Sequence, residues 1–327
     1  MSKNKTVAIV MATYNDWESI LELLPGIDQE LASLGMSGQV VIVDDGSGDF
    51  DCRDQVSGLE LASILSVECV DLYRNHGNQR AVAIGIAYCA DNVPCDYMIV
   101  MDSDHEDDPK YIPDMIVACD QNDGRKVIFA SRSKRSEGVV FKGFYSAYKR
   151  LYYLLTGMPI SIGNYSVVPK SLIRRIANIA ELWSHFPASI MRAKIPYTSV
   201  PSVRAKRTIG ESKMNLVSLL LHALSGFSVH AEIVGVRVLV MAVIAAVSVL
   251  SLLVIAVLLK MFTGIPILGW TSQIVGLLLI MLFQLFITMI IMVFMVVSGR
   301  QQAPMIPIAV YRQFFETVLQ LYPRGKN

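Results

Sequence analysis

The residues in this chain best suited to chemistry are carboxylates that crowd behind a short apolar run. Residues 97–101 read YMIVM, and the acidic side chains that follow are Asp102, Asp104, Glu106, Asp107 and Asp108. Carboxylates this close together repel one another and raise each other's pKa unless a cation lies among them. Oxygen ligands suit Mg²⁺ or Mn²⁺, and a hard cation held by one or two carboxylates typically completes its shell with substrate phosphates.

The spacing of the first three carboxylates sharpens this hypothesis. Asp102, Asp104 and Glu106 occupy alternate positions. In an extended segment alternate side chains point to the same side, so all three are expected to hold one metal ion. The alternative is a solvated acidic loop, which an isolated DxD pattern indicates more often than a metal site. The elements around the cluster must decide between the two.

Strand-like and helix-like segments alternate over the first 210 residues. The short β-branched runs, each ending in polar residues, are TVAIVMATY (6–14), GQVVIVDDG (38–46), DYMIVMDSD (96–104) and KVIFASR (126–132). The amphipathic stretches between them include DWESILELLPGIDQELASLG (16–35) and QRAVAIGIAYCADN (79–92). This order predicts an α/β domain with a mostly parallel sheet.

The ends of these strands are the expected site. Ligands bind parallel sheets beyond the carboxyl ends of the strands, so the clusters ATYND, DDGSGD, DSDHE and SRSKR are expected to converge on one edge. No GxGxxG follows the first strand and no Walker-type phosphate loop is present, which disfavours a dinucleotide enzyme and a P-loop ATPase. A net charge of +1 and the lack of an arginine-rich tract give no indication of a nucleic-acid partner.

Two long apolar runs follow this domain. Residues 238–259 contain no charge over 22 positions, and residues 274–297 add 24 positions in which Gln284 is the only strongly polar side chain. The first run would be roughly 33 Å long as a helix, enough to cross a hydrocarbon core of about 30 Å. We therefore predict two membrane spans; the alternative is a pair of buried core helices. Gln284 could mark a helix–helix or homo-oligomer contact, or be a tolerated lone polar residue.

The basic residues predict the orientation of these spans. Lys and Arg cluster before the first span and after the second, whereas the loop between the spans carries only Lys260. This bias places both termini and the N-terminal domain in the cytoplasm, with the protein integral to the plasma (inner) membrane. The predicted organisation is a cytosolic domain (1–213), an amphipathic interfacial helix (214–232), a two-helix transmembrane region (233–298) and a cytosolic amphipathic helical segment (299–327), the last a membrane-surface or subunit contact.

Five motifs together resemble a known family. ATYND, VDDGS, RNHGNQRAVAIG, MDSDHEDDP and RTIGESKMN occur in the order and spacing of family 2 glycosyltransferases, which have a GT-A (Rossmann-like) fold. The two C-terminal spans make the chain similar to the polyprenyl-phosphate glycosyltransferases, the group that includes dolichol-phosphate mannose synthase. The resemblance covers roughly residues 5 to 298. It implies a nucleotide-sugar donor and a Mg²⁺ or Mn²⁺ ion held by Asp102, Asp104 and Glu106.

The resemblance also implies roles for single residues. The positions that match the donor-binding group are Ala12, Thr13, Tyr14, Asp16, Asp44, Asp45, Arg80, Asp102 and Ser103. The first four would line the nucleotide base, and the acidic pair would touch base and ribose. The positions that match the catalytic group are Asp104, Arg132, Asn164, Arg207 and Lys213. Among these, Arg132 would face the acceptor phosphate, and Arg207 and Lys213 would neutralise donor and acceptor phosphates.

The chain departs from the family pattern at three positions in the site. Ala12 stands where the family usually has Pro, and Asp16 where it has Glu. More important, Asn164 replaces the Asp of a GDF or GDY motif, and Asn cannot accept a proton at neutral pH. A hydroxyl acceptor needs a base, for which Glu181 and His185 are the alternative candidates. A phosphate monoester is already mostly dianionic because its second pKa is about 6.

These observations favour an inverting glycosyltransferase that moves a sugar from a UDP- or GDP-sugar to a polyprenyl phosphate at the cytoplasmic face. Three alternatives stay open: transfer to a lipid hydroxyl, polysaccharide synthesis, and a non-catalytic membrane subunit with a decayed transferase domain. None of Trp17, Trp183 and Trp270 follows an Arg, so the QxxRW-type motif of processive synthases is missing. Retention of the metal and phosphate positions disfavours decay.

Overall fold

The computed structural model describes residues 5–48, 51–132, 149–158, 162–203, 225–262, 269–301 and 304–323. The chain divides into two compact units. The sheet unit consists of Met1–Tyr145, Ile160–Val229 and Pro304–Asn327, and the helical unit consists of Ser146–Pro159 and His230–Ala303. Each unit is described separately below.

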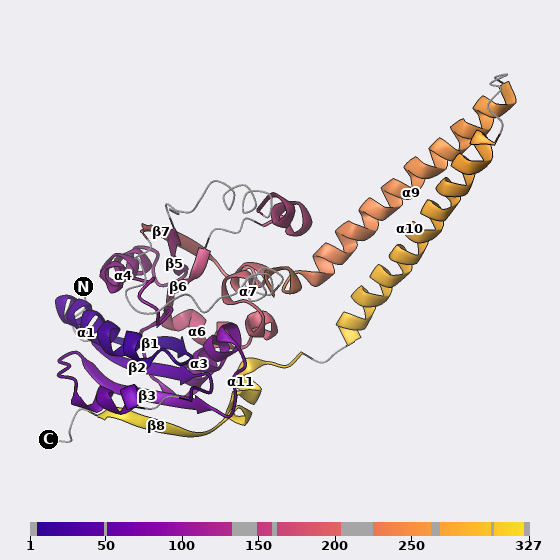
Figure 1. Cartoon of the computed structure of the whole chain (residues 1–327). Helices are drawn as coiled ribbons and strands as arrows, with labels where there is room; N and C mark the ends of the chain where they lie inside the picture. Colours follow the sequence, from indigo (N-terminus) through magenta and orange to yellow (C-terminus); the bar gives the residue numbers. More distant parts are fainter. Residues whose placement is uncertain are drawn as a thin grey trace. The chain divides into compact units, whose positions relative to one another are not determined.

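One eight-stranded sheet organises the sheet unit (Figure 1). Its strands are β1 (Thr6–Thr13), β2 (Ser37–Asp44), β3 (Ile64–Leu72), β4 (Tyr97–Val100), β5 (Val127–Arg132), β6 (Ile162–Pro169), β7 (Tyr197–Ser202) and β8 (Phe315–Pro323). Their order across the sheet is β7-β5-β6-β4-β1-β2-β3-β8. Strands β4, β1, β2 and β3 pair in parallel, β6 runs antiparallel to β4 and β5, and β8 runs antiparallel to β3. The predicted α/β domain with a mostly parallel sheet is confirmed, since β6 and β8 run against the direction of the other described strands.

Helices cover both faces of this sheet. They are α1 (Trp17–Leu34), α2 (Asp51–Asp54), α3 (Asn78–Asn92), α4 (Ile112–Gln121), α6 (Lys170–Ala177), α7 (Phe186–Arg192) and α11 (Pro307–Val310). Short 3₁₀ turns are η1 (Gln55–Gly58), η2 (Pro109–Tyr111), η3 (Ala180–Trp183) and η4 (Tyr311–Gln313). Strand β1 shows why the chain folds this way, because its successive side chains enter opposite cores. Val7, Ile9 and Met11 pack with α1 and α4, whereas Ala8 and Val10 pack with α3.

The close approach of α3 to the sheet requires a glycine. A Cβ atom at Gly85 would lie 2.5 Å from Cγ1 of Val10 and 2.9 Å from Cγ2 of Val43. Such a distance is too short for two carbon atoms, so only glycine lets the helix lie this close. The packing fixes the start of α3, where Gln79 and Arg80 lie, beside the carboxyl ends of β1 and β2.

The predicted C-terminal amphipathic helix is wrong. Residues 315–323 form β8, which extends the sheet along the free edge of β3 with a register that pairs Val70 with Val318. Successive side chains of this segment point to opposite faces of the sheet. The segment also contains Thr317, Val318 and Tyr322, which favour a strand. An uncovered edge of β3 would expose a row of unpaired backbone groups, and β8 supplies their partners. The segment therefore belongs to the sheet unit.

Two long helices, α9 (Ala231–Phe262) and α10 (Trp270–Gln301), form most of the helical unit. The stretches at 231–262 and 272–299 are long and apolar enough to cross a membrane. Only 11% of the first apolar window and none of the second is buried, so the alternative of two core helices is wrong. The buried residues of α9 recur every seven positions and are small: Gly235, Ala242, Val249 and Ala256. This repeat lets α9 and α10 pack closely as a helical hairpin.

Two further predictions concern Gln284 and the interfacial helix at 214–232. Gln284 is exposed on α10, so it does not make the contact between the two spans. Most of the predicted interfacial helix at 214–232 lies outside the described residues, which resume at residue 225.

Candidate active site at the carboxyl edge of the sheet

Backbone and hydroxyl groups tie together the loops that follow β1, β2 and β4. The Asp45 N–H donates to the Thr13 carbonyl at 2.8 Å, which joins the ends of β2 and β1. The Ser103 hydroxyl donates to the Ala12 carbonyl at 2.9 Å, which joins the loop after β4 to β1. Three of the four polar clusters therefore converge as predicted. The fourth is described only as far as Arg132, the last residue of β5.

The loop after β1 carries the residues expected at the nucleotide base. Thr13 is buried, Tyr14 is exposed, and Asp16 accepts a hydrogen bond from the Ser19 hydroxyl at 2.8 Å. Asn15 has a left-handed backbone and fixes the neighbouring loop, since its side-chain oxygen accepts from Gly48 N–H at 2.8 Å. The loops after β1 and β2 therefore form one surface on which Tyr14 presents an exposed ring.

Asp44 is fully buried and holds the protein's own groups. One carboxylate oxygen accepts from the Trp17 indole N–H at 2.9 Å, and the other accepts from Ser47 N–H at 2.8 Å. These bonds link the end of β2 to the start of α1. The indole partner was not recognisable from the sequence, in which Trp17 and Asp44 are 27 positions apart.

Asp45 fixes the loop that leads into α3. Its carboxylate accepts from the N–H groups of His76 at 2.6 Å and Gly77 at 2.8 Å. Burial raises the pKa of Asp45, and the two backbone donors act in the opposite direction. On the far side of this loop the His76 ring packs edge-on against Phe314, with ring centroids 5.1 Å apart. The C-terminal segment thus packs against the loop that leads into α3, a contact that sequence reasoning missed.

The three carboxylates predicted to hold one metal ion, Asp102, Asp104 and Glu106, do not lie on one extended segment. Strand β4 ends at Val100, and His105 adopts a left-handed backbone with φ of 63°, so the chain turns between Asp104 and Glu106 instead of remaining extended. Glu106 N–H donates back to the Asp104 carboxylate at 3.1 Å, which closes the turn. Within the described part of the chain, no three His, Cys, Asp or Glu side chains are grouped to hold a metal ion.

Two carboxylates still offer hard oxygen ligands at this edge. Asp102 and Asp104 are partly exposed, whereas Asp107 is buried and accepts from Asp102 N–H at 2.9 Å. A pair of carboxylates fits Mg²⁺ or Mn²⁺ when substrate phosphates complete the shell. The donor set therefore fits a divalent cation bound together with a nucleoside diphosphate.

A chain of three hydrogen bonds orients Asn164 toward Asp102. The Phe186 N–H donates to the Gln79 side-chain oxygen at 2.9 Å, so the Gln79 amide nitrogen faces the Asn164 oxygen at 3.3 Å. The Asn164 amide nitrogen in turn donates to Asp102 at 3.1 Å. Because a backbone N–H can only donate, the first bond fixes the direction of the other two. Gln79 lies within the quoted motif RNHGNQR, yet its role could not be read from the sequence.

Glu181 and His185, the two alternative candidates for a catalytic base, are both engaged in contacts that stabilise the fold. The Arg192 guanidinium donates to the Glu181 carboxylate at 2.7 Å. The Nδ1 atom of buried His185 accepts from Ala188 N–H at 3.3 Å and caps α7. A neutral imidazole that accepts at Nδ1 carries its proton on Nε2. A second proton would have to bind at Nδ1, where it would face the Ala188 N–H.

The cations expected at the site are only partly within the described residues. Arg80 is exposed at the start of α3, and the backbone of Arg132 ends β5 at the same edge. Arg207 and Lys213 lie outside the described residues. Burial, followed by the charges of Arg74 and Arg80, lowers the pKa of His76, so this imidazole is neutral at pH 7.

The mixed sheet, with helices on both faces, is a Rossmann-like sheet of the GT-A type. Residues 8–178, just over half of the chain, match glycosyl transferase family 2, and the chain belongs to this family. It is therefore a glycosyltransferase.

Two relatives and one solved structure are similar to this chain. An undecaprenyl-phosphate 4-deoxy-4-formamido-L-arabinose transferase from Klebsiella pneumoniae is 28% identical over 220 residues, which cover 66% of this chain and 64% of the relative. The chain thus spans just under two thirds of that relative. The glycosyltransferase YkcC of Bacillus subtilis, whose function is uncharacterised, is 27% identical over 286 residues, 84% of each chain. Glucosyl-3-phosphoglycerate synthase from Mycobacterium tuberculosis, solved with Mn²⁺, UDP-glucose and phosphoglyceric acid, has a TM-score of 0.50 at 16% identity, covering 71% of this chain and 80% of that one. This last likeness concerns the fold.

Proposed function

We propose that this protein is an inverting glycosyltransferase that moves a sugar from a UDP- or GDP-sugar to a polyprenyl phosphate. Three findings support the proposal: membership of family 2, two helices able to span a membrane, and a relative named for transfer to undecaprenyl phosphate. The catalytic sheet unit and both termini would lie on the cytoplasmic side, as the distribution of Lys and Arg predicts.

The choice of a phosphate acceptor rests on the contacts of the three side chains that were considered as the catalytic base. Asn164 cannot accept a proton and donates to Asp102. Glu181 is paired with Arg192, and His185 caps α7 through the nitrogen that would act as base. A lipid hydroxyl needs a base to remove its proton during attack. A phosphate monoester is already mostly dianionic at neutral pH and needs cations instead.

The donor would bind along the carboxyl edge, with its diphosphate at Asp102 and Asp104. These two residues would hold Mg²⁺ or Mn²⁺, which when bound stabilises the negative charge of the departing nucleoside diphosphate. Ala12, Thr13, Tyr14 and Asp16 would line the base. Asp45 and Ser103 would fix the loops around the ribose and diphosphate, and buried Asp44 would fix the floor beneath them.

The cations would act on the phosphates. We expect Arg80 to contact the donor diphosphate, and Arg132, Arg207 and Lys213 to draw the acceptor phosphate toward the sugar and relieve its repulsion with the donor. Asn164 would act as a positioning residue: its amide donates to Asp102, whereas a carboxylate at the same place would put two negative charges about 3 Å apart.

The test offers purified full-length enzyme three lipids separately, each with an active sugar nucleotide. The lipids are polyprenyl phosphate, polyprenol and diacylglycerol. We expect a sugar phosphate ester from polyprenyl phosphate alone. Transfer to either hydroxyl lipid, with no transfer to the phosphate, would overturn the assignment of the acceptor while leaving the enzyme class intact.

A further inference from the structure

A short helix from the middle of the sequence packs against the start of the first apolar span. Residues 149–156 are helical and belong to the helical unit together with α9. Buried Tyr152 on this helix contacts the ring of His230 edge-on, with centroids 6.3 Å apart. Arg237 on α9 donates to the Leu154 carbonyl at 2.6 Å and to the Tyr153 carbonyl at 3.5 Å. A guanidinium at a helix carboxyl terminus satisfies the last carbonyls and the helix dipole.

The position of Arg237 sets the depth of this helix. Arg237 is the last charged residue before the uncharged run at 238–259. Its guanidinium also lies where a side chain at Gly157 would be, since a Cβ there would come within 2.7 Å of a guanidinium nitrogen. The carboxyl end of helix 149–156 is therefore fixed at the level where the apolar part of α9 begins. That level is the boundary between hydrocarbon and headgroups.

The outer side of helix 149–156 is apolar and uncovered in the structure. Leu151, Tyr153 and Leu154 are 50%, 61% and 60% exposed. Neighbouring large apolar side chains are costly when exposed to water but are stabilised at the acyl boundary of a bilayer. The helix thus has the chemistry of an element that lies on the membrane surface.

A groove at the same place is lined by cations. Its walls are Lys149, Arg150, Tyr153, Leu154, Gly157 and Arg237, and its volume is about 770 Å³. Among the described residues that line it, Lys149, Arg150 and Arg237 are positive, the tyrosine phenol is neutral, and none is a carboxylate. The volume falls within the range of small-molecule sites, about 300–1,000 Å³.

We propose that this groove binds the phosphate headgroup of an anionic membrane phospholipid. Basic side chains at headgroup depth attract anionic lipids, and the aromatic and leucine walls would contact the glycerol and first acyl carbons. The proposal rests only on membrane insertion of the helical unit, and it does not depend on which acceptor the enzyme uses.

The experiment uses purified full-length protein in a neutral detergent, without donor or acceptor. Phosphatidylglycerol and phosphatidylcholine are added in equal amounts, and the retained lipids are counted by native mass spectrometry. We expect a preference for phosphatidylglycerol, and about a 25-fold loss of its affinity in the double variant Lys149→Gln, Arg150→Gln, at about fivefold for each cation removed. Arg237 is left intact because it caps the helix.

A matched double variant, Arg174→Gln, Arg175→Gln, removes two exposed arginines from α6 of the sheet unit and should leave lipid retention unchanged. Equal loss in both double variants, or no preference for phosphatidylglycerol in the unmodified protein, would overturn the proposal. Displacement of phosphatidylglycerol by equimolar polyprenyl phosphate would also overturn it and assign the groove to the acceptor. Failure of the transfer assay would not change any of these readouts.

Discussion

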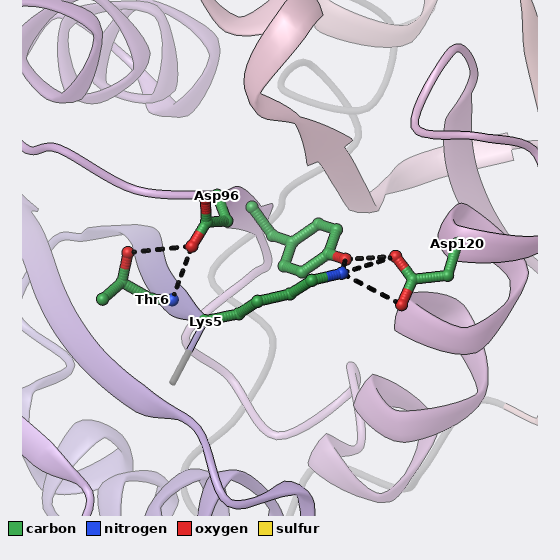
Figure 2. A network of polar contacts seen from close by, with 5 residues as sticks. Lys5, Thr6, Asp96 and Asp120 are labelled. Carbon is green, nitrogen blue, oxygen red and sulfur yellow. Dashed lines mark hydrogen bonds and ion pairs between the residues drawn. The ribbon is translucent and has the colours of Figure 1, made fainter. Parts of the chain in front are cut away.

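The two edges of the sheet use the same residue types in opposite ways. At the amino edge, Lys5 donates to both carboxylate oxygens of Asp120 at 3.0 and 3.1 Å (Figure 2). The Tyr97 hydroxyl accepts a hydrogen bond from Lys5 and donates one to Asp120. Asp96 beside them accepts from the N–H and hydroxyl of Thr6 at 3.0 and 3.4 Å. Asp120 and Asp96 thus both have donors from the protein itself.

At the carboxyl edge the carboxylates divide into two groups. Asp44, Asp45 and Asp107 are buried and accept from indole or backbone N–H groups, as at the amino edge. Asp102 and Asp104 are partly exposed; Asp102 accepts from the Asn164 amide and Asp104 accepts from Glu106 N–H. The comparison teaches that buried carboxylates in this fold shape the loops, whereas the two partly exposed ones are accessible to a ligand.

The largest expected effect comes from Asp104→Asn. Replacing this carboxylate should lower transfer by more than about 100-fold, because the charge of the departing diphosphate would lose part of its stabilisation. Initial rates are measured in EDTA and after addition of Mg²⁺ or Mn²⁺. Asp123→Asn, which changes an exposed carboxylate in a left-handed turn, is the control and should remain active. Full turnover of the unmodified enzyme in EDTA would contradict the metal assignment.

A smaller effect is expected from the Gln79–Asn164 pair. Asn164→Leu and Gln79→Leu should each lower kcat/KM by about 10- to 100-fold, the usual cost of losing a residue that orients a metal ligand. Because both act on Asp102 through one chain of bonds, the double variant should be little worse than Asn164→Leu alone.

Mn²⁺ affinity in the presence of nucleoside diphosphate, followed by electron paramagnetic resonance, should fall in parallel with these rates. Gln320→Leu, at an exposed glutamine of β8, is the matched control. Additive losses in the double variant would show that Gln79 and Asn164 act separately.

The smallest effect is expected at the amino edge. Lys5→Met should lower the free energy of unfolding by about 1 kcal/mol or less, the value of a partly exposed ion pair, and leave kcat/KM unchanged. Burial by itself would raise the pKa of Asp120, but hydrogen bonds from Tyr97 and Lys5 outweigh it and the pKa is lowered overall. A carboxyl whose pKa falls on folding adds stability above its unfolded pKa of about 4, and this stability disappears as the pH falls through the folded value.

The difference in melting temperature between Lys5→Met and the unmodified protein should therefore shrink as the pH is lowered below about 4. Thermal unfolding of the full-length protein in detergent measures this. A loss of activity in Lys5→Met at neutral pH, in protein that melts normally, would remove the contrast between the two edges.

The sequence predicted the parts of the fold that depend on local pattern. The runs in β1, β2 and β4 are apolar and end in polar residues, and parallel strands bring such ends together whatever their connections. The left-handed turn at His105 could not be predicted, because it depends on the burial of Asp107 and on bonds closed only in the folded chain. The Trp17 partner of Asp44 and the direction of the Asn164 amide likewise depend on contacts between distant segments.

The C-terminal strand was missed for a related reason. Residues 315–323 contain residue types that favour a strand, but Phe315, Val318, Leu319 and Tyr322 also recur at helical spacing. The partner that decides for the strand is the edge of β3, which lies some 250 residues earlier in the chain, where Cys69 pairs with Leu319.

Strand β8 also constrains how the protein is made. The ribosome completes β1 to β7 first and both apolar helices next, and only then releases the strand that covers the edge of β3. The sheet therefore stays open at that edge until the end of synthesis and is completed last. As two membrane spans, α9 and α10 would return the chain to the side from which it entered, which is the side that β8 needs in order to pair with β3. A chain in which only one of the two helices spanned a membrane would hold β8 on the side opposite β3, so pairing of these strands requires that both helices span or that neither does.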